Sequence, residues 1–343
     1  MRHILDYHLD DLKTKLHEVL MKPYKVNQVM QWVYKKHTLN FEDMTNISKE
    51  QKTALLNAFE TFSPKIIETR TSTDGTTKFL LELSDNHSIE MVFMPDGKKH
   101  TLCISTQVGC GRGCSFCATA KIGLKRNLSQ AELVSQLHTA YNYFPDIKIT
   151  NLVLMGMGEP LDNYDALVSF LHIVNSEEGF SFSARRVTVS TCGVVPKIYS
   201  LAESGIKVKL AVSLNSAIDK YRSEIMPINK NYPLDELKKA SIYFRKKTSF
   251  RITFEYIMIA NVNMEDTDIK AIMKFCGDIS CKLNLIKWNE VKGMPWKSPT
   301  ENQIQQFVQK LRVLPVAITI RKSKGADITG ACGQLSGNKL KQD

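Results

Sequence analysis

Residues 101–117 read TLCISTQVGCGRGCSFC, an alternating apolar and polar stretch that runs into three closely spaced cysteines. Leu102 and Ile104 lie on one face of the extended chain, and Cys103 and Ser105 lie on the other, because side chains alternate along a strand. The pattern predicts a strand with one buried face. A cysteine cluster thus follows the carboxyl end of a strand, where α/β folds build their sites.

Segments of the same kind recur along the chain, with amphipathic stretches such as residues 128–144 between them. The further expected strands are NLVLMG (151–156), RRVTVST (185–191), KVKLAVSL (207–214), RITFEYIMI (251–259), KLNLIKW (282–288) and VAITIRK (316–322). Strands that alternate with helices form parallel sheets, so we expect an α/β fold, a partial (βα)6 barrel followed by a seventh strand. The polar strand faces would line its interior, with Ser190 and Ser213 at the carboxyl ends.

The rest of the chain divides into segments of different periodicity. Residues 1–65 have helical spacing and predict an N-terminal helical accessory domain, either a packing accessory or an arm that contacts RNA. Residues 66–98 change to a period of two around the turn sequence SDN, which predicts a β-hairpin extension. The barrel core is expected over residues 99–290. Residues 291–343 form a C-terminal segment with a glycine-punctuated loop at 325–333.

The composition limits the class of protein. The chain has 343 residues and a formal net charge of +11, which favours a polyanionic partner, although solubility alone also explains it. Lys35, Lys36 and His37 follow a helical stretch, and we expect them to be exposed. No apolar run reaches the roughly 18 residues of a membrane span, and the start lacks an apolar signal core, so we expect a cytoplasmic protein with no membrane role.

Four of the eight cysteines lie within residues 103–117, which in a cytoplasmic protein favours a metal or redox site over a disulfide framework. Cys110, Cys114 and Cys117 have the spacing C-x₃-C-x₂-C. Zinc normally takes four ligands in two pairs, whereas three cysteines on a 4Fe–4S cube leave one iron open to a small molecule. A zinc site with a distant fourth ligand and incidental buried cysteines are the alternatives.

A glycine-rich turn, LMGMGEP, follows the second strand at residues 154–160. Glycine leaves backbone groups accessible there, and Glu159 can accept a hydrogen bond from an ammonium group. An ordinary turn at the end of a strand is the alternative.

The cysteine spacing after a first strand resembles the radical S-adenosylmethionine (SAM) superfamily, in which the open iron binds SAM. Longer segments resemble the RlmN/Cfr family of radical SAM RNA methyltransferases, its RlmN branch in particular, over nearly the whole chain. These segments are YKVNQVMQWVYKK, IEMVFMP, TLCISTQVGCGRGCSFCATAKIGLKRNLS, NLVLMGMGEPLDNYD, RRVTVSTCGVVP, AVSLNSA, MPINKNYPL and RKSKGADITGACGQL.

This resemblance implies methylation of carbon 2 of an adenosine in 23S rRNA, at the peptidyl-transferase centre, and of the adenosine next to the anticodon in tRNA. That ring carbon is electron-poor and has no nucleophilic lone pair, so a radical cofactor is needed. The implied cofactors are a 4Fe–4S cluster and SAM, with two SAM molecules per turnover. The implied partners, besides the RNA, are an electron donor such as flavodoxin or ferredoxin and a thiol reductant.

Two other functions stay open. A Cfr-type enzyme would methylate carbon 8 of the same adenine and confer antibiotic resistance, although the MGMGEPL segment resembles RlmN, whereas Cfr commonly has alanine at the position of Pro160. A non-enzymatic zinc-containing RNA-binding protein is more remote. A sulfur-inserting RNA modifier usually needs a second cluster, and the sequence has no second cysteine triplet.

The resemblance also implies roles for single positions. The cluster ligands would be Cys110, Cys114 and Cys117. The SAM contacts would be Gly158, Glu159, Ser190, Ser213, Leu214, Asn215 and Asn289. The catalytic residues would be Cys332 as methyl carrier, Cys103 as its disulfide partner and Glu90 as proton acceptor. The chain departs from the commonest family pattern at Asn215, where many members have histidine, and at Cys192, where many have serine or threonine. Candidate RNA contacts are Lys121, Lys125, Arg126 and Lys324.

Overall fold

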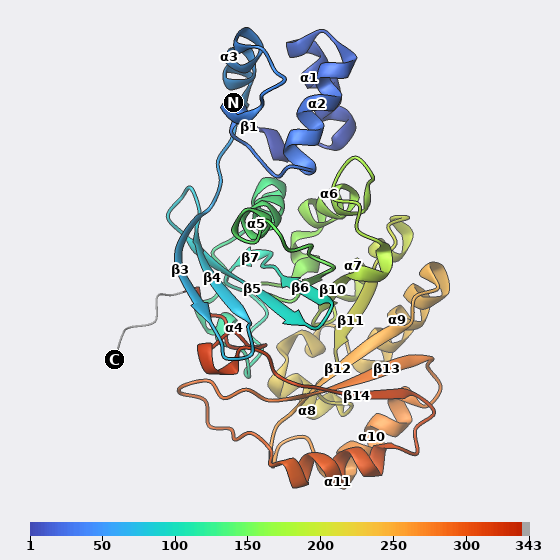
Figure 1. The fold of residues 1–343 in the computed structure, drawn as a ribbon. Coiled ribbons are helices and arrows are strands. Elements are labelled where there is room, and N and C mark those ends of the chain that lie inside the picture. The colour runs from blue at the N-terminus through green and yellow to red at the C-terminus, as the bar shows by residue number, and fades with distance from the viewer. Residues whose placement is uncertain (338–343) are drawn as a thin grey trace.

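Seven parallel strands form the centre of the structure, a computed structural model that describes residues 1–337 (Figure 1). They are β6 (Lys99–Cys103), β9 (Asn151–Leu154), β10 (Val187–Thr191), β11 (Lys209–Ser213), β12 (Ile252–Met258), β13 (Cys281–Lys287) and β14 (Ala317–Arg321). The expected partial barrel with a seventh strand is therefore confirmed. The alternation is also as expected, since Val187 and Val189 are buried, whereas Thr188 and Ser190, each the next residue along the strand, are only half-buried.

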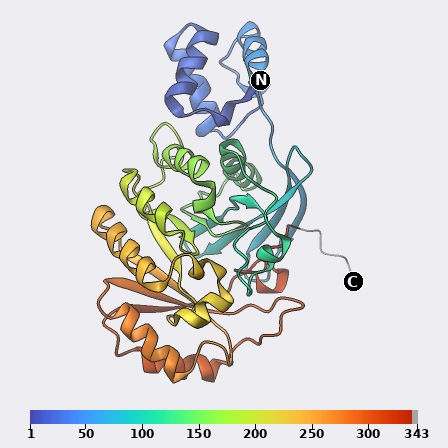
Figure 2. The same cartoon turned by 180° about the vertical axis from the view of Figure 1, so that it is seen from behind.

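The longer helices lie on the outer face of the curved sheet (Figures 1 and 2). They are α5 (Gln130–Tyr143), α6 (Tyr164–Asn175), α7 (Val195–Glu203), α9 (Leu234–Thr248), α10 (Asp266–Cys276) and α11 (Glu301–Leu311). The expected capping box of Ser129 and Glu132 begins α5, because each side chain accepts a hydrogen bond from the backbone N–H of the other residue. Two short helices, α4 (Ala118–Ile122) and α8 (Asp219–Ile225), lie near the strand ends that carry the site.

An antiparallel extension continues the sheet beyond β6. It consists of β5 (Ser88–Asp96), β4 (Thr77–Glu82) and β3 (Lys65–Thr71), which bring the sheet to ten strands. The sequence predicted the β4–β5 hairpin but not β3 as its third strand. A bulge between Ile66 and Glu68 breaks the regular alternation of β3, so its period is weak in the sequence. A small separate sheet pairs β7 (Gln107–Val108) with β8 (Arg126–Asn127).

The N-terminal segment is a helical module at one end of the molecule (Figures 1 and 2). It contains α1 (Leu9–Leu20), α2 (Pro23–Tyr34) and α3 (Lys49–Ala58), and a short parallel pair of β1 (Arg2–His3) and β2 (Phe59–Glu60). Lys35 and Lys36 are exposed as expected, but His37 is not. Its ring stacks on Tyr141 of α5 at 3.9 Å between centroids, so tertiary packing covers it. None of the helices within residues 1–337 has the length and apolar character that a bilayer crossing requires.

Candidate active site

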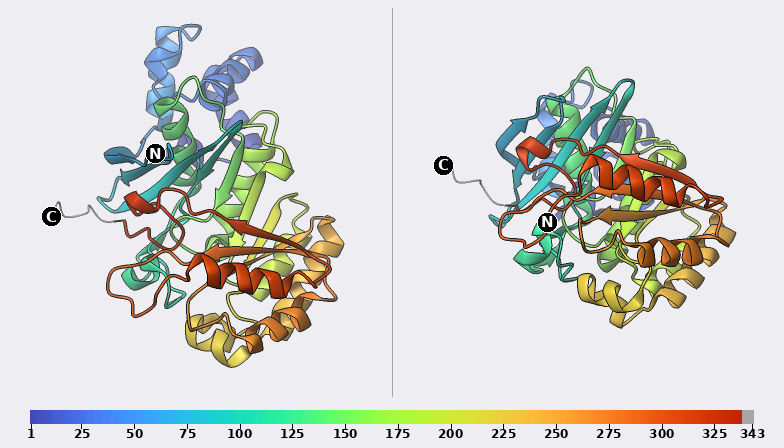
Figure 3. Two further views of the ribbon diagram at one scale, coloured as in Figure 1. Left: turned by 60° about the horizontal axis from the view of Figure 1, so that its bottom comes forward. Right: turned by 90° about the horizontal axis from the view of Figure 1, so that it is seen from below.

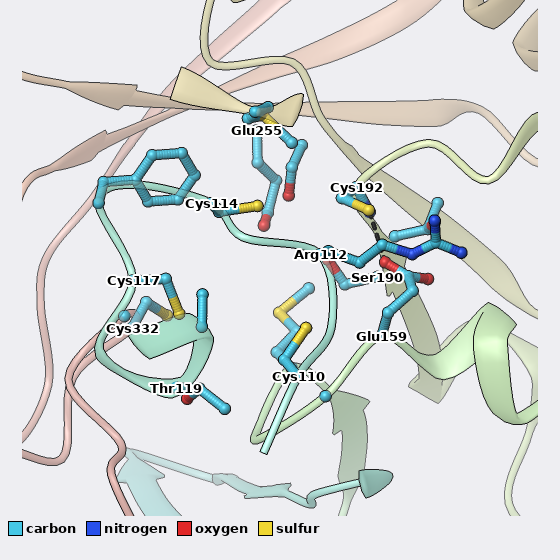
Figure 4. A pocket seen from close by; sticks show the side chains of 18 of the residues that line it. Cys110, Arg112, Cys114, Cys117, Thr119, Glu159, Ser190, Cys192, Glu255 and Cys332 are labelled. Carbon is cyan, nitrogen blue, oxygen red and sulfur yellow. Dashed lines mark hydrogen bonds between the residues drawn. The ribbon is translucent and has the colours of Figure 1, made fainter. Parts of the chain in front are cut away.

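A pocket that opens to solvent, with about 930 Å³ of space between its walls, lies at the carboxyl ends of the parallel strands (Figure 4). The family resemblance pointed to many of its lining residues, namely Cys110, Cys114, Cys117, Gly158, Glu159, Ser190, Ser213, Asn215 and Cys332. In Figure 4, Cys332 lies beside Cys117, and Glu159 and Ser190 lie across the pocket from them. The fold thus brings together segments that are far apart in the sequence.

The loop with the three cysteines is held mainly by its backbone. The N–H of Cys110 donates to the carbonyl of Gly123 at 3.2 Å, and the N–H of Ser115 donates to Ile225 of α8 at 3.0 Å. Gly109 has a φ of +77°, and a Cβ there would lie 1.8 Å from the Gly123 oxygen. Only glycine fits this close approach. The loop geometry therefore depends on glycine and the backbone, and it leaves the cysteine side chains free to act as ligands.

The thiol set suits a cluster better than a single ion. Burial raises the pKa of Cys110 to about 12 and also raises that of Cys114, so both are thiols until a metal cation replaces the proton. Within residues 1–337, no three His, Cys, Asp or Glu side chains stand close enough to hold one metal ion. Cys110, Cys114 and Cys117 line the same pocket. Three thiols of one loop are a donor set that fits three irons of a 4Fe–4S cluster.

The glycine-rich turn after β9 packs tightly against β7. Gly158 has a φ of +100°, and a Cβ there would lie 2.6 Å from the Cβ of Gln107. The side-chain oxygen of Gln107 accepts the N–H of Glu159 at 2.9 Å. The carboxylate of Glu159 accepts backbone N–H groups from Leu161 at 3.0 Å and Cys192 at 2.7 Å, while burial raises its pKa. These bonds fix the carboxylate in the lining of the pocket, where its other lone pairs can accept from an ammonium group.

The end of β11 and the two residues after it contribute unequally to the pocket. Ser213 and Asn215 line it, and Asn215 adopts a φ of +55°, a conformation that asparagine tolerates. The side-chain oxygen of Asn215 accepts the N–H of Ile257 at 2.9 Å. Leu214 is different, because its side chain is fully buried in the core and does not line the pocket. The structure therefore keeps the Leu214 side chain out of this pocket, and of the other expected SAM contacts only Asn289 does not line it.

A second pocket, of about 430 Å³, adjoins the first through Cys332, which lines both. Cys103, Asn289 and Arg321 line the second pocket. The side-chain N–H of Asn289 donates to the Cys332 carbonyl at 3.2 Å. Burial and then the neighbouring Cys332 raise the pKa of Cys103 to about 12, while Arg321 acts in the opposite direction. Both cysteines are free thiols in the structure, so one chamber holds a half-buried loop thiol and a buried strand thiol.

Glu90 is fully buried beside the C-terminal tail. One carboxylate oxygen pairs with the ammonium of Lys78 at 2.9 Å. The other oxygen accepts the backbone N–H groups of Ser336 at 2.7 Å and Gly337 at 3.0 Å. Both oxygens of the expected proton acceptor are therefore engaged by protein groups in this structure.

Several polar residues of the site were not predicted. Glu255 lines the first pocket, and the alternation of RITFEYIMI puts it on the polar face of its strand, opposite Ser213 in the register. That signal was readable in the sequence. Arg112 lines the same pocket and forms a two-pronged ion pair with Asp162, 50 residues away. No local pattern predicts such a distant partner.

Arg222 on α8 is a further residue that sequence reasoning missed. Its guanidinium is fully buried and donates to the carbonyls of Cys192 at 2.8 Å, Ser213 at 3.0 Å and Leu214 at 3.0 Å. Burial lowers its pKa to about 10. These bonds tie together the ends of β10 and β11, which carry expected SAM contacts. A single charged residue in a short helix offers no sequence signal for this function.

The candidate RNA contacts differ in their exposure and in whether other protein groups already bind their side chains. Arg126 is bound by Glu132, at 2.7 and 2.8 Å, and by Asp85, at 2.6 Å, so protein groups engage its guanidinium in this structure, and its contact with RNA stays a prediction. Two carboxylates neutralise its charge. Lys121 and Lys125 are exposed beside α4, and Lys324 is half-buried.

Comparison with known proteins identifies the family. Residues 104–275 match the model of the radical SAM superfamily, and residues 3–60 match that of the ribosomal RNA large subunit methyltransferase N-terminal domain. The chain is 40% identical to a protein of Dictyoglomus turgidum and 42% identical to one of Clostridium botulinum, each named "Probable dual-specificity RNA methyltransferase RlmN". In both cases 99% of this chain and 98% of the relative are covered.

A solved structure agrees with these relatives. The crystal structure of a radical SAM methyltransferase from Sphaerobacter thermophilus is 37% identical and superposes with a TM-score of 0.94. The match covers 98% of this chain and 100% of that one. The chain therefore belongs to the radical SAM superfamily and, within it, to the RlmN family of RNA methyltransferases.

Proposed function

We propose that the chain methylates carbon 2 of an adenosine in 23S rRNA and in tRNA. The name of the N-terminal family model, which refers to large-subunit ribosomal RNA, supports the first target. The relatives named as dual-specificity enzymes support a second. The observation that carries the proposal is the position of Cys332, which lines both the pocket of the three cysteines and the chamber of Cys103.

Cys110, Cys114 and Cys117 would hold the 4Fe–4S cluster, which when bound supplies the electron that cleaves SAM to methionine and a 5′-deoxyadenosyl radical. Gly158, Glu159, Ser190, Ser213, Asn215 and Asn289 would contact SAM, and Leu214 could do so only with its backbone. Glu159 would orient the amino group of SAM as a charge-assisted acceptor. The walls of the pocket would keep water away from the reacting groups.

Cys332 is the proposed methyl carrier. Its thiolate attacks the methyl group of a first SAM, so that a sulfur–carbon bond forms as the sulfonium–carbon bond breaks. From the junction of the two pockets, the methylated sulfur can reach the adenine and later Cys103. The 5′-deoxyadenosyl radical would take a hydrogen atom from the sulfur-bound methyl group, and the carbon radical so formed would add to carbon 2 of the adenine. Glu90 accepts the proton of that ring carbon, and the adduct passes one electron to a one-electron acceptor, a role that the oxidised cluster would fill. Cys103 then attacks the Cys332 sulfur; the bond from that sulfur to the carrier carbon breaks, the carbon takes up a proton, and the methylated base leaves while a disulfide remains.

The partners follow from this chemistry. Cluster reduction needs a one-electron donor of the flavodoxin or ferredoxin type, and the disulfide needs a thiol reductant. Lys121 and Lys125, exposed beside α4, are proposed phosphate contacts. We also propose four separate functional parts, namely the helical module, the extension, the barrel core and the C-terminal segment. The helical module would contact RNA. The cytoplasmic location stays a prediction.

The test is nucleoside mass spectrometry of RNA treated with the anaerobically reconstituted enzyme, SAM and a reductant. Appearance of 2-methyladenosine in 23S rRNA and tRNA is the expected result. Appearance of 8-methyladenosine would transfer the chain to the carbon-8 chemistry of Cfr, and no methylated adenosine with either RNA would overturn the proposal. Cys332→Ala should be inactive. Cys276→Ala, which changes a cysteine buried on α10, is the matched control and should keep activity.

A further inference from the structure

One buried ion pair holds both sides of the Cys332 loop. The ammonium of Lys78 on β4 lies 2.9 Å from the carboxylate of Glu90 on β5, and the two side chains are only 7% and 1% exposed. The pair joins neighbouring strands of the antiparallel extension, where Lys78 and Val92 are directly opposite. Buried charges are retained only where every donor and acceptor has a partner. The other hydrogen-bond partners of Lys78 and Glu90 therefore show which parts of the chain the ion pair holds.

Lys78 binds the side of the loop that precedes Cys332. Its ammonium donates to the hydroxyl of Thr329 at 2.9 Å and approaches the Thr329 carbonyl at 3.4 Å. Thr329 has a φ of +52°, in the left-handed region, which β-branched residues rarely adopt. Such a backbone persists only where surrounding contacts hold it. The Lys78 ammonium is such a contact, three residues before the carrier cysteine.

Glu90 binds the side that follows Cys332. Its second oxygen accepts the N–H groups of Ser336 and Gly337, as described above. Gly337 has a φ of +64°, and a Cβ there would lie 2.9 Å from Met157 Cε. The tail is therefore packed closely against the barrel where Glu90 holds it. Figure 3 shows this end of the chain crossing the barrel beside the extension.

We propose that Lys78 is a positioning residue, which forms with Glu90 a latch that sets the Cys332 loop in its resting position. The inference rests on the proposed function, which gives Cys332 and Glu90 their roles. The two uses of Glu90 exclude each other in time, because a carboxylate whose oxygens bind Lys78 and the tail is not free to meet a substrate proton. Entry of the adenine therefore requires Ser336 and Gly337 to leave Glu90. Release of the tail also frees Cys332 to move toward Cys103.

The test measures exposure of the Cys332 thiol and needs no methylation activity. The purified full-length protein, kept anaerobic and reduced, is treated with iodoacetamide, and the labelling rate of each cysteine is followed by peptide mass spectrometry. Three variants open the latch in different ways: Lys78→Met, Glu90→Gln and the double variant. Lys65→Met, at an exposed position on β3, is the matched control. Cys276, fully buried on α10, reports unfolding of the whole chain.

Each latch variant should raise the Cys332 labelling rate by about tenfold or more and leave Cys276 protected, since local opening exposes only the loop. The double variant should label no faster than the faster single variant, because both remove the same pair. The double variant also keeps the test valid if a single variant unfolds. Each single variant leaves one buried charge without its partner, whereas the double variant removes both charges. Lys65→Met should match the wild type.

Unchanged labelling at Cys332 in the double variant would refute the latch. An equal rise at Cys332 and Cys276 in that variant would also refute it, because it would report global unfolding. Hydrogen exchange provides a second measure, in which the amides of the peptide with Ser336 and Gly337 should exchange faster in Glu90→Gln than in the wild type. The two proposals can fail separately. If the RNA assay gave no methylated adenosine but the latch variants still labelled faster at Cys332, the proposed function would be rejected and the latch would be supported.

Discussion

The two ends of the described chain differ in the contacts that attach them to the barrel. The N-terminal module has stacked rings, with His37 at 3.9 Å from Tyr141 and 5.6 Å from Phe180 between centroids, besides polar contacts such as those of Gln130 with the Leu5 and Tyr7 carbonyls. The C-terminal tail buries Leu335, but at Ser336 and Gly337 it is held by polar groups, above all the Lys78–Glu90 pair. Ring stacking buries apolar surface and has no competing partner in water. Hydrogen bonds and ion pairs can be exchanged for water or for a substrate. The first contact is suited to permanent attachment, and the second to release.

In the mechanism proposed above, this difference puts the methyl carrier at the end of the chain that can be released. Cys332 lies on the C-terminal loop, whereas Cys103 lies on β6 of the sheet. The proposed carrier must meet SAM, a base and a second thiol, which requires a mobile segment, while Cys103 can stay fixed. The predictions below test the two contacts in order of expected effect.

The largest effect is expected for Cys103→Ala. Without this thiol nothing can displace the Cys332 sulfur, so the RNA should stay covalently attached, and turnover should fall by more than about 10³-fold. Denaturing gel electrophoresis followed by nuclease digestion and peptide mass spectrometry locates the crosslink at Cys332. Free RNA with full turnover would contradict the disulfide step.

Phe180→Ala tests the ring contacts between the N-terminal module and the barrel, which we call the apolar dock. The ring packs against His37 and, edge to face, against Tyr34 at 5.9 Å. Its loss should lower the free energy of unfolding by about 2–4 kcal/mol, measured by urea denaturation. Trypsin should then cut faster after Lys65, the first residue of β3, which follows the connection from the module. Cys332 labelling should not change, and a change there would mean that the two ends are not independent.

The same dock should weaken in acid. Burial lowers the pKa of His138, which lies against His37 and Phe180, to about 3. Its pKa in the unfolded chain is near 6.5. The unfolded state therefore binds more protons below pH 6.5, and stability decreases as the pH falls from about 6.5 toward 3. The expected loss from this residue is about 1.4 kcal/mol per pH unit.

Urea denaturation at pH 7.5 and 5.5 measures this loss. His138→Phe cannot take up the proton, so its stability should depend less on pH by that amount. An equal pH dependence in both proteins would show that His138 is not buried in the way the ring contacts indicate.

The smallest effect is expected for Lys35→Met. The Lys35 ammonium donates to the carbonyls of Glu177 and Gly179, each at 2.6 Å, and to the Ser181 hydroxyl at 2.7 Å, all in the loop after α6. These bonds are largely exposed, so their removal should cost about 1 kcal/mol or less. A loss as large as that of Phe180→Ala would mean that the dock is polar and would remove the contrast between the two ends.

Local features were predictable from the sequence because they depend on neighbouring residues. Alternation with a period of two predicted the parallel strands and the interior position of Ser190 and Ser213, and Ser129 with Glu132 predicted the start of α5. The same alternation would have identified Glu255. The bulge in β3 broke the period, and that strand was missed.

Long-range contacts could not be read in this way. Lys78 and Thr329 are 251 positions apart, and Glu90 and Ser336 are 246 apart, so no window of sequence contains either pair. The partial burial of His37 depends likewise on Tyr141, a residue of another element. By itself the sequence determined the parallel strands, the cap of α5 and the cysteine spacing, since backbone periodicity and local hydrogen bonding act within a few residues. Only the tertiary structure decided which charges meet, because sheet order and packing bring distant segments into contact.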